Sequence, residues 1–222
     1  MKQFNKNTQL AKKIFSHIWD DKTKKAFFDW LRLIFSFRGI WCFAPAVLTI
    51  FFVYWAEGYS KPLISKAPNE VLAIFLMSIV VALFLTRSIL YRLEIDYVLL
   101  LMAVNFLCRE IHFTGTDNAV FIIAVFVFVW VIYRKDQILI NIENAKLFQI
   151  ALTGTVFTYF VAILIQRRVF TIERIPILPN EQLMHVALEE VIENIAHAYF
   201  IFCGVTSFFS IPKNRSKRSN RL

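Results

Sequence analysis

The sequence has 222 residues, of which 58% are hydrophobic and only 18% are charged, whereas soluble proteins average about 25% charged residues. Phenylalanine alone occurs 24 times. A soluble domain of this size could not hide so many apolar side chains, because too much of its chain must lie at the surface. The composition excludes an ordinary soluble protein, and 5 Gly and 6 Pro exclude a fibrous or disordered one. We predict an all-α, polytopic integral membrane protein.

The N-terminal segment, residues 1–38, is polar at its start and carries seven Lys within residues 1–25, so we expect no cleavable signal peptide. In residues 24–38, Lys25, Asp29, Arg32 and Ser36 recur at helical spacing, with aromatic and aliphatic residues between them. A narrow charged stripe beside a broad apolar face is typical of an amphipathic helix in the headgroup plane. An extension of the first membrane span and a partner-binding helix are the alternatives.

Residues 39–210 are predicted to form a single domain of six transmembrane helices, since a helix needs roughly 20 residues to cross a bilayer. The apolar segments are 39–55, 70–86, 95–113, 119–133, 147–166 and 183–210. Residues 211–222 form a basic tail that we expect to attract anionic lipid. A nucleic-acid patch is the alternative for this tail, but the positive-inside pattern is favoured, so no nucleic acid is expected as a partner.

The distribution of positive charge predicts the orientation of these six spans. With both termini on one side, that side carries 19 of the 25 Lys and Arg residues, and the opposite side carries 6. Loops rich in Lys and Arg stay in the cytoplasm. We therefore expect a multi-pass protein of a cell membrane, of the bacterial inner-membrane type, with both termini cytoplasmic.

The sixth segment contains charged residues that are costly in a membrane, at about 2.5–3.5 kcal/mol each on insertion scales. His185, Glu189, Glu193 and His197 form a ladder with a spacing of four residues. At about 100° per residue, Glu190, Glu193 and His197 lie within an arc of about 60°, with Glu189 about 40° outside it. This pattern predicts a polar site in the outer half of the bilayer.

The third segment offers a second group, consisting of Asn105, Arg109, Glu110 and His112. Asn105, Arg109 and His112 share one face of a regular helix, whereas Glu110 points about 160° away from His112. Six spans would bring the end of this helix to the same depth as the group in the sixth segment. We expect the two groups to meet there. Glu110 and His112 cannot both face one site on a regular helix, so both would reach it only if the helix frays before Thr114 and Gly115.

A purely structural ion-pair network, in which Arg109 neutralises one Glu, is one interpretation of the cluster. One Arg cannot neutralise four Glu side chains, so the cluster needs a further cation or a protonated carboxyl group. The expected metal ligands are Glu110, His112, Glu190, Glu193 and His197, a donor set that suits Zn, Fe or Mn. Glu193→Gln should then lower stability if a metal is bound. Without a metal, the same substitution should leave stability equal or higher.

The leading hypothesis for function is a metal-dependent hydrolase or transferase that acts on a lipid or lipid-linked substrate at the outer leaflet. Glu189 would be the general base on a metal-bound water, and Arg109 would hold a phosphate or an oxyanion. A proton- or cation-coupled transporter or channel subunit is the second hypothesis. The third is a structural subunit of an oligomer or a larger membrane complex.

Overall fold

The structure is a computed structural model that describes residues 16, 18–36, 39–57, 66–111, 116–143, 145–167, 171–172, 175–176 and 181–210. Of these, the side chains of residues 66, 116–118, 143, 171–172, 175–176 and 181–185 are not described. The described chain is helical, apart from a two-residue antiparallel pair formed by β1 (Thr171–Ile172) and β2 (Ile175–Pro176). The predicted all-α class is therefore confirmed for this part of the chain.

Every predicted apolar segment coincides with a helix. In chain order the helices are α2 (Asp21–Ile34), the 3₁₀ turn η1 (Gly39–Cys42), α3 (Ala44–Glu57), α4 (Lys66–Tyr91), α5 (Glu94–Ile111), α6 (Thr116–Tyr133), α7 (Lys135–Glu143), α8 (Lys146–Gln166) and α9 (Glu181–Phe208). The six apolar segments correspond to α3, α4, α5, α6, α8 and α9.

Three of these helices are long and apolar enough to cross a membrane within the described residues, over Ala67–Tyr91, Lys146–Gln166 and Val186–Phe208. The apolar helices Ala44–Ala56 and Ala119–Tyr133 are shorter. Helix α5 carries two acidic residues in its first turn and an arginine in its last. The helices are consistent with a membrane protein, and crossing by all six remains a prediction.

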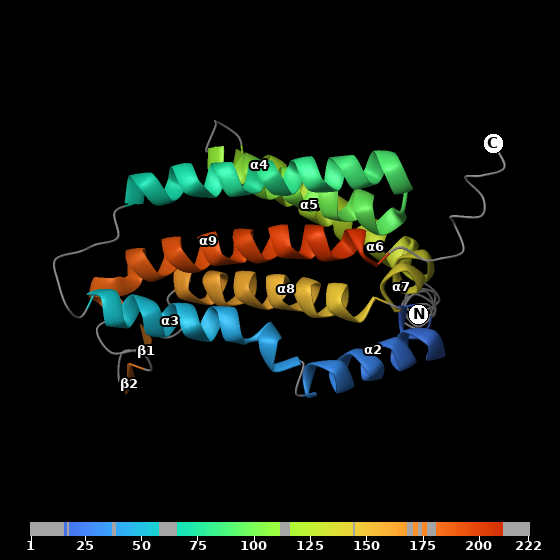
Figure 1. Ribbon diagram of the computed structural model, residues 1–222, viewed down its shortest axis with the longest axis horizontal. Coiled ribbons are helices and arrows are strands. Elements are labelled where there is room, and N and C mark those ends of the chain that lie inside the picture. Colours follow the sequence, from blue (N-terminus) through green and yellow to red (C-terminus); the bar gives the residue numbers. More distant parts are fainter. Residues whose placement is uncertain are drawn as a thin grey trace, which may run out of the picture.

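Helix α9 lies at the centre of the bundle, with α4 on one side and α8 and α3 on the other (Figure 1). One buried apolar cluster joins α4, α5, α8 and α9 around Phe84 and Phe200, and a second joins α3, α8 and α9 around Val53 and Leu188. Gly154 lets α8 approach α9 closely, because a Cβ atom at this position would overlap the ring of Tyr199. These contacts fix the rotation of α9, which carries the charged residues of the sixth segment.

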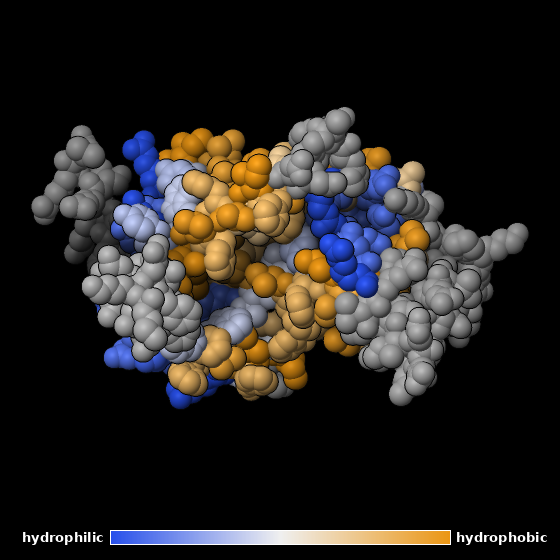
Figure 2. Space-filling view, turned by 180° about the vertical axis from the view of Figure 1, so that it is seen from behind, coloured by the Kyte–Doolittle hydropathy of each residue, from blue (hydrophilic) through white to orange (hydrophobic). Residues whose placement is uncertain are grey.

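The surface is apolar across the middle of the molecule. Figure 2 shows a band of hydrophobic residues over one face, with hydrophilic residues toward both ends. Large apolar side chains on the outward faces of α3, α4 and α6 are highly exposed, including Phe51 at 70%, Ile89 at 64% and Phe121 at 69%. Exposed apolar surface of this extent is unfavourable in water and suits contact with lipid.

The predicted amphipathic helix is α2, which begins at Asp21, three residues before the expected start. Asp20 caps it by accepting a hydrogen bond from the backbone N–H of Thr23 at 2.8 Å. The indole Nε1 of Trp30 donates to Thr153 Oγ1 on α8 at 2.8 Å, which ties the apolar side of α2 to the bundle. Phe28 and Phe35 stay 61% and 83% exposed. Residues 37–38 of the predicted helix lie outside the described residues.

Acidification is expected to loosen the attachment of α2. Lys135 Nζ donates to Asp20 Oδ2 at 2.6 Å, and this bond, with the cap bond from Thr23, holds the pKa of Asp20 well below its ordinary value of 3.8. A depressed folded-state pKa stabilises the docked helix above the unfolded pKa, and this stabilisation is lost progressively as the pH falls from about 5 toward the folded-state pKa. We expect the hydrogen-exchange protection factors of the α2 amides, which compare the observed rate with the intrinsic rate at the same pH, to fall on acidification.

Asp20→Asn should lower these protection factors already at neutral pH and remove most of their pH dependence. Asp21→Asn is the matched control, because the side chain of Asp21 is 99% exposed and its ion pair is with nearby Lys24 on the same helix. Equal pH dependence in wild type and Asp20→Asn would contradict the assignment of this ion pair.

Candidate functional site

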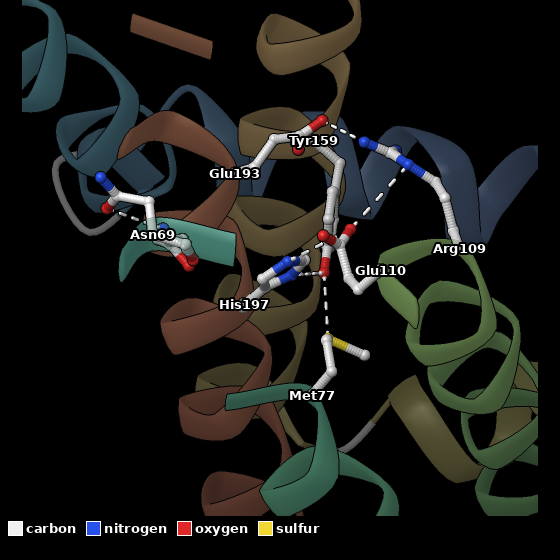
Figure 3. Close-up of polar contacts among 8 residues, drawn as sticks. Asn69, Met77, Arg109, Glu110, Tyr159, Glu193 and His197 are labelled. Atoms are coloured by element: carbon white, nitrogen blue, oxygen red, sulfur yellow. Dashed lines mark hydrogen bonds and ion pairs between the residues drawn. The ribbon is translucent and has the colours of Figure 1, made fainter. Parts of the chain in front are cut away.

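The candidate site lies where the end of α5 meets the middle of α9. Helix α5 supplies Arg109 and Glu110 in its last turn, and α9 supplies Glu193 and His197 from successive turns. Tyr159 reaches the same place from α8, so three helices contribute (Figure 3). The sequence prediction that charged residues of the third and sixth segments meet is confirmed for these four charged side chains.

Arg109 links the two acidic residues of the cluster. Its guanidinium Nη2 donates to Glu193 Oε1, and its Nε lies 3.9 Å from Glu110 Oε1. Glu110 Oε1 lies in turn 3.6 Å from His197 Nε2. A continuous chain of ionisable groups therefore runs from Glu193 through Arg109 and Glu110 to His197, as the dashed lines in Figure 3 show.

His197 is the most buried member of the cluster, at 1% exposure. Its Nδ1 lies 2.6 Å from the hydroxyl oxygen of Tyr159, and that hydroxyl also lies 3.6 Å from Met77 Sδ. The Tyr159 ring stacks on Phe106 of α5 with 4.4 Å between ring centroids, which fixes the position of the phenol. His197 Nε2 is buried and has no hydrogen-bond partner among the described residues.

Within the cluster, exposure is highest at Arg109 and lowest at His197. The side chain of Arg109 is 26% exposed, that of Glu193 11%, that of Glu110 9% and that of His197 1%. Beyond His197 the core is apolar, with Val80, Phe84, Ala103 and Phe200 at 0–2% exposure. Among the described residues, the cluster therefore reaches the surface at Arg109 and is closed by apolar side chains beyond His197.

A neutral pair flanks the charged cluster. Asn194 Nδ2 donates to the backbone oxygen of Asn69 at 3.2 Å and to its side-chain oxygen at 3.1 Å. Asn69 lies in the first turn of α4, so this pair joins α4 to α9 next to Glu193, as seen beside the cluster in Figure 3. The pair fixes the depth of α9 relative to α4.

The remaining predicted site residues are placed differently. Glu189 and Glu190 are half-buried on the same part of α9, and Glu189 is close enough to Glu193 to act on it electrostatically. His112 lies outside the described residues, as does the side chain of His185. Asn105 is buried at 3% exposure and its Oδ1 has no hydrogen-bond partner within the described part of the chain.

Two residues of the site were absent from the sequence prediction, namely Tyr159 and Asn69. A tyrosine in an otherwise apolar segment is most often a core residue, so periodicity alone gave no reason to select it. Among the described side chains, no group of three or more His, Cys, Asp or Glu residues is arranged to hold a metal ion.

No protein-family model, curated protein or solved structure matches this chain. The protein is therefore described by its own fold and site. It is a helical protein with three helices able to span a membrane and a buried Arg–Glu–His–Tyr cluster between α5, α8 and α9.

Proposed function

We propose that the protein is a membrane-embedded, metal-dependent hydrolase or transferase that acts on a lipid or lipid-linked substrate from the outer leaflet. The observation that supports this proposal is the meeting of Glu110 and His197 at 3.6 Å, in a cluster that reaches the surface of the described chain at Arg109 and is closed by apolar side chains beyond His197. An enzyme needs access from one side, whereas a transport pathway must continue to the other.

The hydrogen bonds of Tyr159 influence which ring nitrogen of His197 carries a proton. Tyr159 has one hydroxyl proton, and where this proton is donated to Met77 Sδ, the phenol oxygen accepts a hydrogen bond from His197 Nδ1–H. Nε2 then carries a lone pair that faces the Glu110 carboxylate. In a neutral imidazole these two electron-rich atoms face each other, and either a metal ion or a proton on Nε2 is needed between them.

In this proposal, Glu110 Oε1 and His197 Nε2, 3.6 Å apart, would supply two of the ligands of a divalent metal, and carboxylate oxygen with imidazole nitrogen is a donor pair that suits zinc. A metal-bound His typically donates its other N–H to a fixed oxygen, which is the role of Tyr159 here. In the proposal, His112, Glu190 and Glu193 are the other candidate ligands.

The remaining groups have roles at the accessible edge. Glu189 would act as general base toward a water molecule. Arg109 has five N–H groups in a fixed fork, so it can hold Glu193 and still offer donors to a substrate phosphate or a developing oxyanion. Its 26% exposure supports contact with a bound substrate.

A proton- or cation-coupled transporter or channel subunit is the second candidate, favoured by charge balance. Arg109 and a protonated His197 would neutralise Glu110 and Glu193 without any metal. If Tyr159 donates to His197 Nδ1 instead, His197 Nε2–H faces Glu110 and the pair can exchange a proton. The apolar layer beyond His197 argues against a continuous proton pathway.

Metal analysis of the purified protein tests the proposal. We expect stoichiometric Zn, Fe or Mn in the wild type, its loss in Glu110→Gln, and a metal affinity about 10–100-fold lower in Tyr159→Phe. Glu94→Gln, at the opposite end of α5, is the matched control and should keep the metal. A metal-free wild type that is insensitive to chelators would reject the metal and favour the proton-handling alternative.

We further infer that six helices span a cell membrane of the bacterial inner-membrane type, with both termini in the cytoplasm. In a variant without the three native Cys, Ser65→Cys should react with an impermeant thiol reagent added outside intact cells. Arg92→Cys, in the exposed turn between α4 and α5, should react only after lysis. The reverse pattern would overturn the topology and the outer-leaflet placement of the site.

A further inference from the structure

A cavity of about 890 Å³ lies between α2 and the helices α7 and α8. It lies over the first part of α8, up to Thr153, whereas the candidate site contacts α8 further along the helix, at Tyr159. Its volume falls in the range of small-molecule sites, about 300–1,000 Å³. Trp19, Phe27 and Leu33 line it from the α2 side, and Ile142 and Leu152 from the other.

The lining changes from cationic to apolar along α8. Lys146, the first residue of α8, is exposed at one end of the lining, and Leu152 and Thr153 lie about 10 Å further along the helix. Arg32 and Asp29 of α2 also line the cavity and lie 3.9 Å apart. Two cations against one carboxylate leave the charged part of the lining net positive.

The position of the cavity relates this gradient to the membrane. Helix α8 is one of the three helices able to cross a bilayer, and that apolar stretch begins at Lys146. The Lys146 end of the cavity therefore lies at headgroup depth, and the Leu152 end of the α8 lining lies at acyl-chain depth. A soluble metabolite would not match an aromatic and aliphatic lining that continues into the depth of the membrane.

We propose that this cavity binds one anionic phospholipid of the leaflet that meets the start of α8. Lys146 holds the headgroup phosphate as a charge-assisted hydrogen-bond donor, and Arg32 on the α2 side adds to the positive charge of the lining. The first part of an acyl chain packs among Trp19, Phe27 and Leu152. The bond from Trp30 to Thr153 closes the deep end and holds α2 over the lipid. This site is independent of the proposed enzymatic function.

Native mass spectrometry of the full-length protein, purified in detergent and incubated with phosphatidylglycerol or phosphatidylcholine, tests the proposal. We expect one retained phosphatidylglycerol per chain and about tenfold less phosphatidylcholine. Lys146→Glu should lower phosphatidylglycerol retention about tenfold, and Ala26→Trp, which fills the cavity from α2, should abolish retention of both lipids. Lys146→Glu adds no bulk, so it keeps the test decisive if Ala26→Trp misfolds.

Lys22→Glu and Ala67→Trp are the matched controls, because both positions are exposed and outside the cavity lining. Both should retain phosphatidylglycerol as the wild type does. Equal retention of the two lipids by the wild type would overturn the proposal, as would unchanged retention in a folded Ala26→Trp protein. Metal content measured on the same samples separates this outcome from failure of the proposed enzyme function.

Discussion

Glu193→Gln is expected to destabilise the protein by about 3 kcal/mol whether or not the site holds a metal, because it removes the carboxylate that accepts a hydrogen bond from the largely buried Arg109 and leaves Glu110, at 3.9 Å, to balance its charge. This value is the lower end of the range for breaking a buried ion pair, since Arg109 keeps 26% exposure. The midpoint of unfolding in a denaturing detergent measures the change.

This expectation revises the one drawn from the sequence. Without the Arg109 contact, removing one of several neighbouring carboxylates relieves repulsion, so the metal-free protein should have kept or gained stability. With the contact, the substitution is destabilising in both cases. Glu193→Gln therefore does not discriminate between a metal site and a proton-handling site, and Glu110→Gln with metal analysis does.

A double substitution provides the control. Arg109→Gln with Glu193→Gln removes both charges, so it should recover part of the stability lost in either single variant. Asp29→Asn, a substitution of an exposed acidic residue, should change stability by less than about 0.5 kcal/mol. A Glu193→Gln protein as stable as the wild type would contradict the ion pair.

Asp96→Ala is expected to be more damaging, at about 4 kcal/mol, because it leaves Arg87 fully buried and unpaired. Arg87 Nε donates to Asp96 Oδ1 at 2.9 Å, and the two side chains are 3% and 0% exposed. The guanidinium also lies over the rings of Tyr91 and Phe208, 5.2 and 5.1 Å from their centroids. The pair thus joins α4, α5 and the end of α9.

Replacing both charges together should avoid this loss of stability. Arg87→Met with Asp96→Leu is expected to be about as stable as the wild type, because apolar side chains of similar size avoid the cost of burying two charges. Arg87 Nη1 and Asp96 Oδ2 have no hydrogen-bond partners among the described residues, so little hydrogen bonding is lost. Exposed Arg92→Met is the control and should be near neutral. Equal destabilisation by the single and double substitutions would show that the loss of stability does not come from leaving Arg87 unpaired.

Sequence alone determined the helical class and the approximate limits of the helices. Apolar runs and the breaks between them are local features, and each of the six runs became a helix. The sequence also identified Arg109, Glu110, Glu193 and His197 as ionisable residues within apolar segments. Helical periodicity placed Glu193 and His197 on one face of α9, and the structure confirms this, because both depend only on the geometry of one helix.

Only the tertiary structure decided which side chains meet across helices. Arg109 and Glu110 are about 100° apart on α5, yet both reach α9, because their side chains are long and α5 ends beside it. The partner role of Tyr159 and the depth set by Asn69 depend on how α8 and α4 are rotated and shifted against α9. That arrangement is fixed by packing, such as the close approach at Gly154, which periodicity within a single helix does not encode.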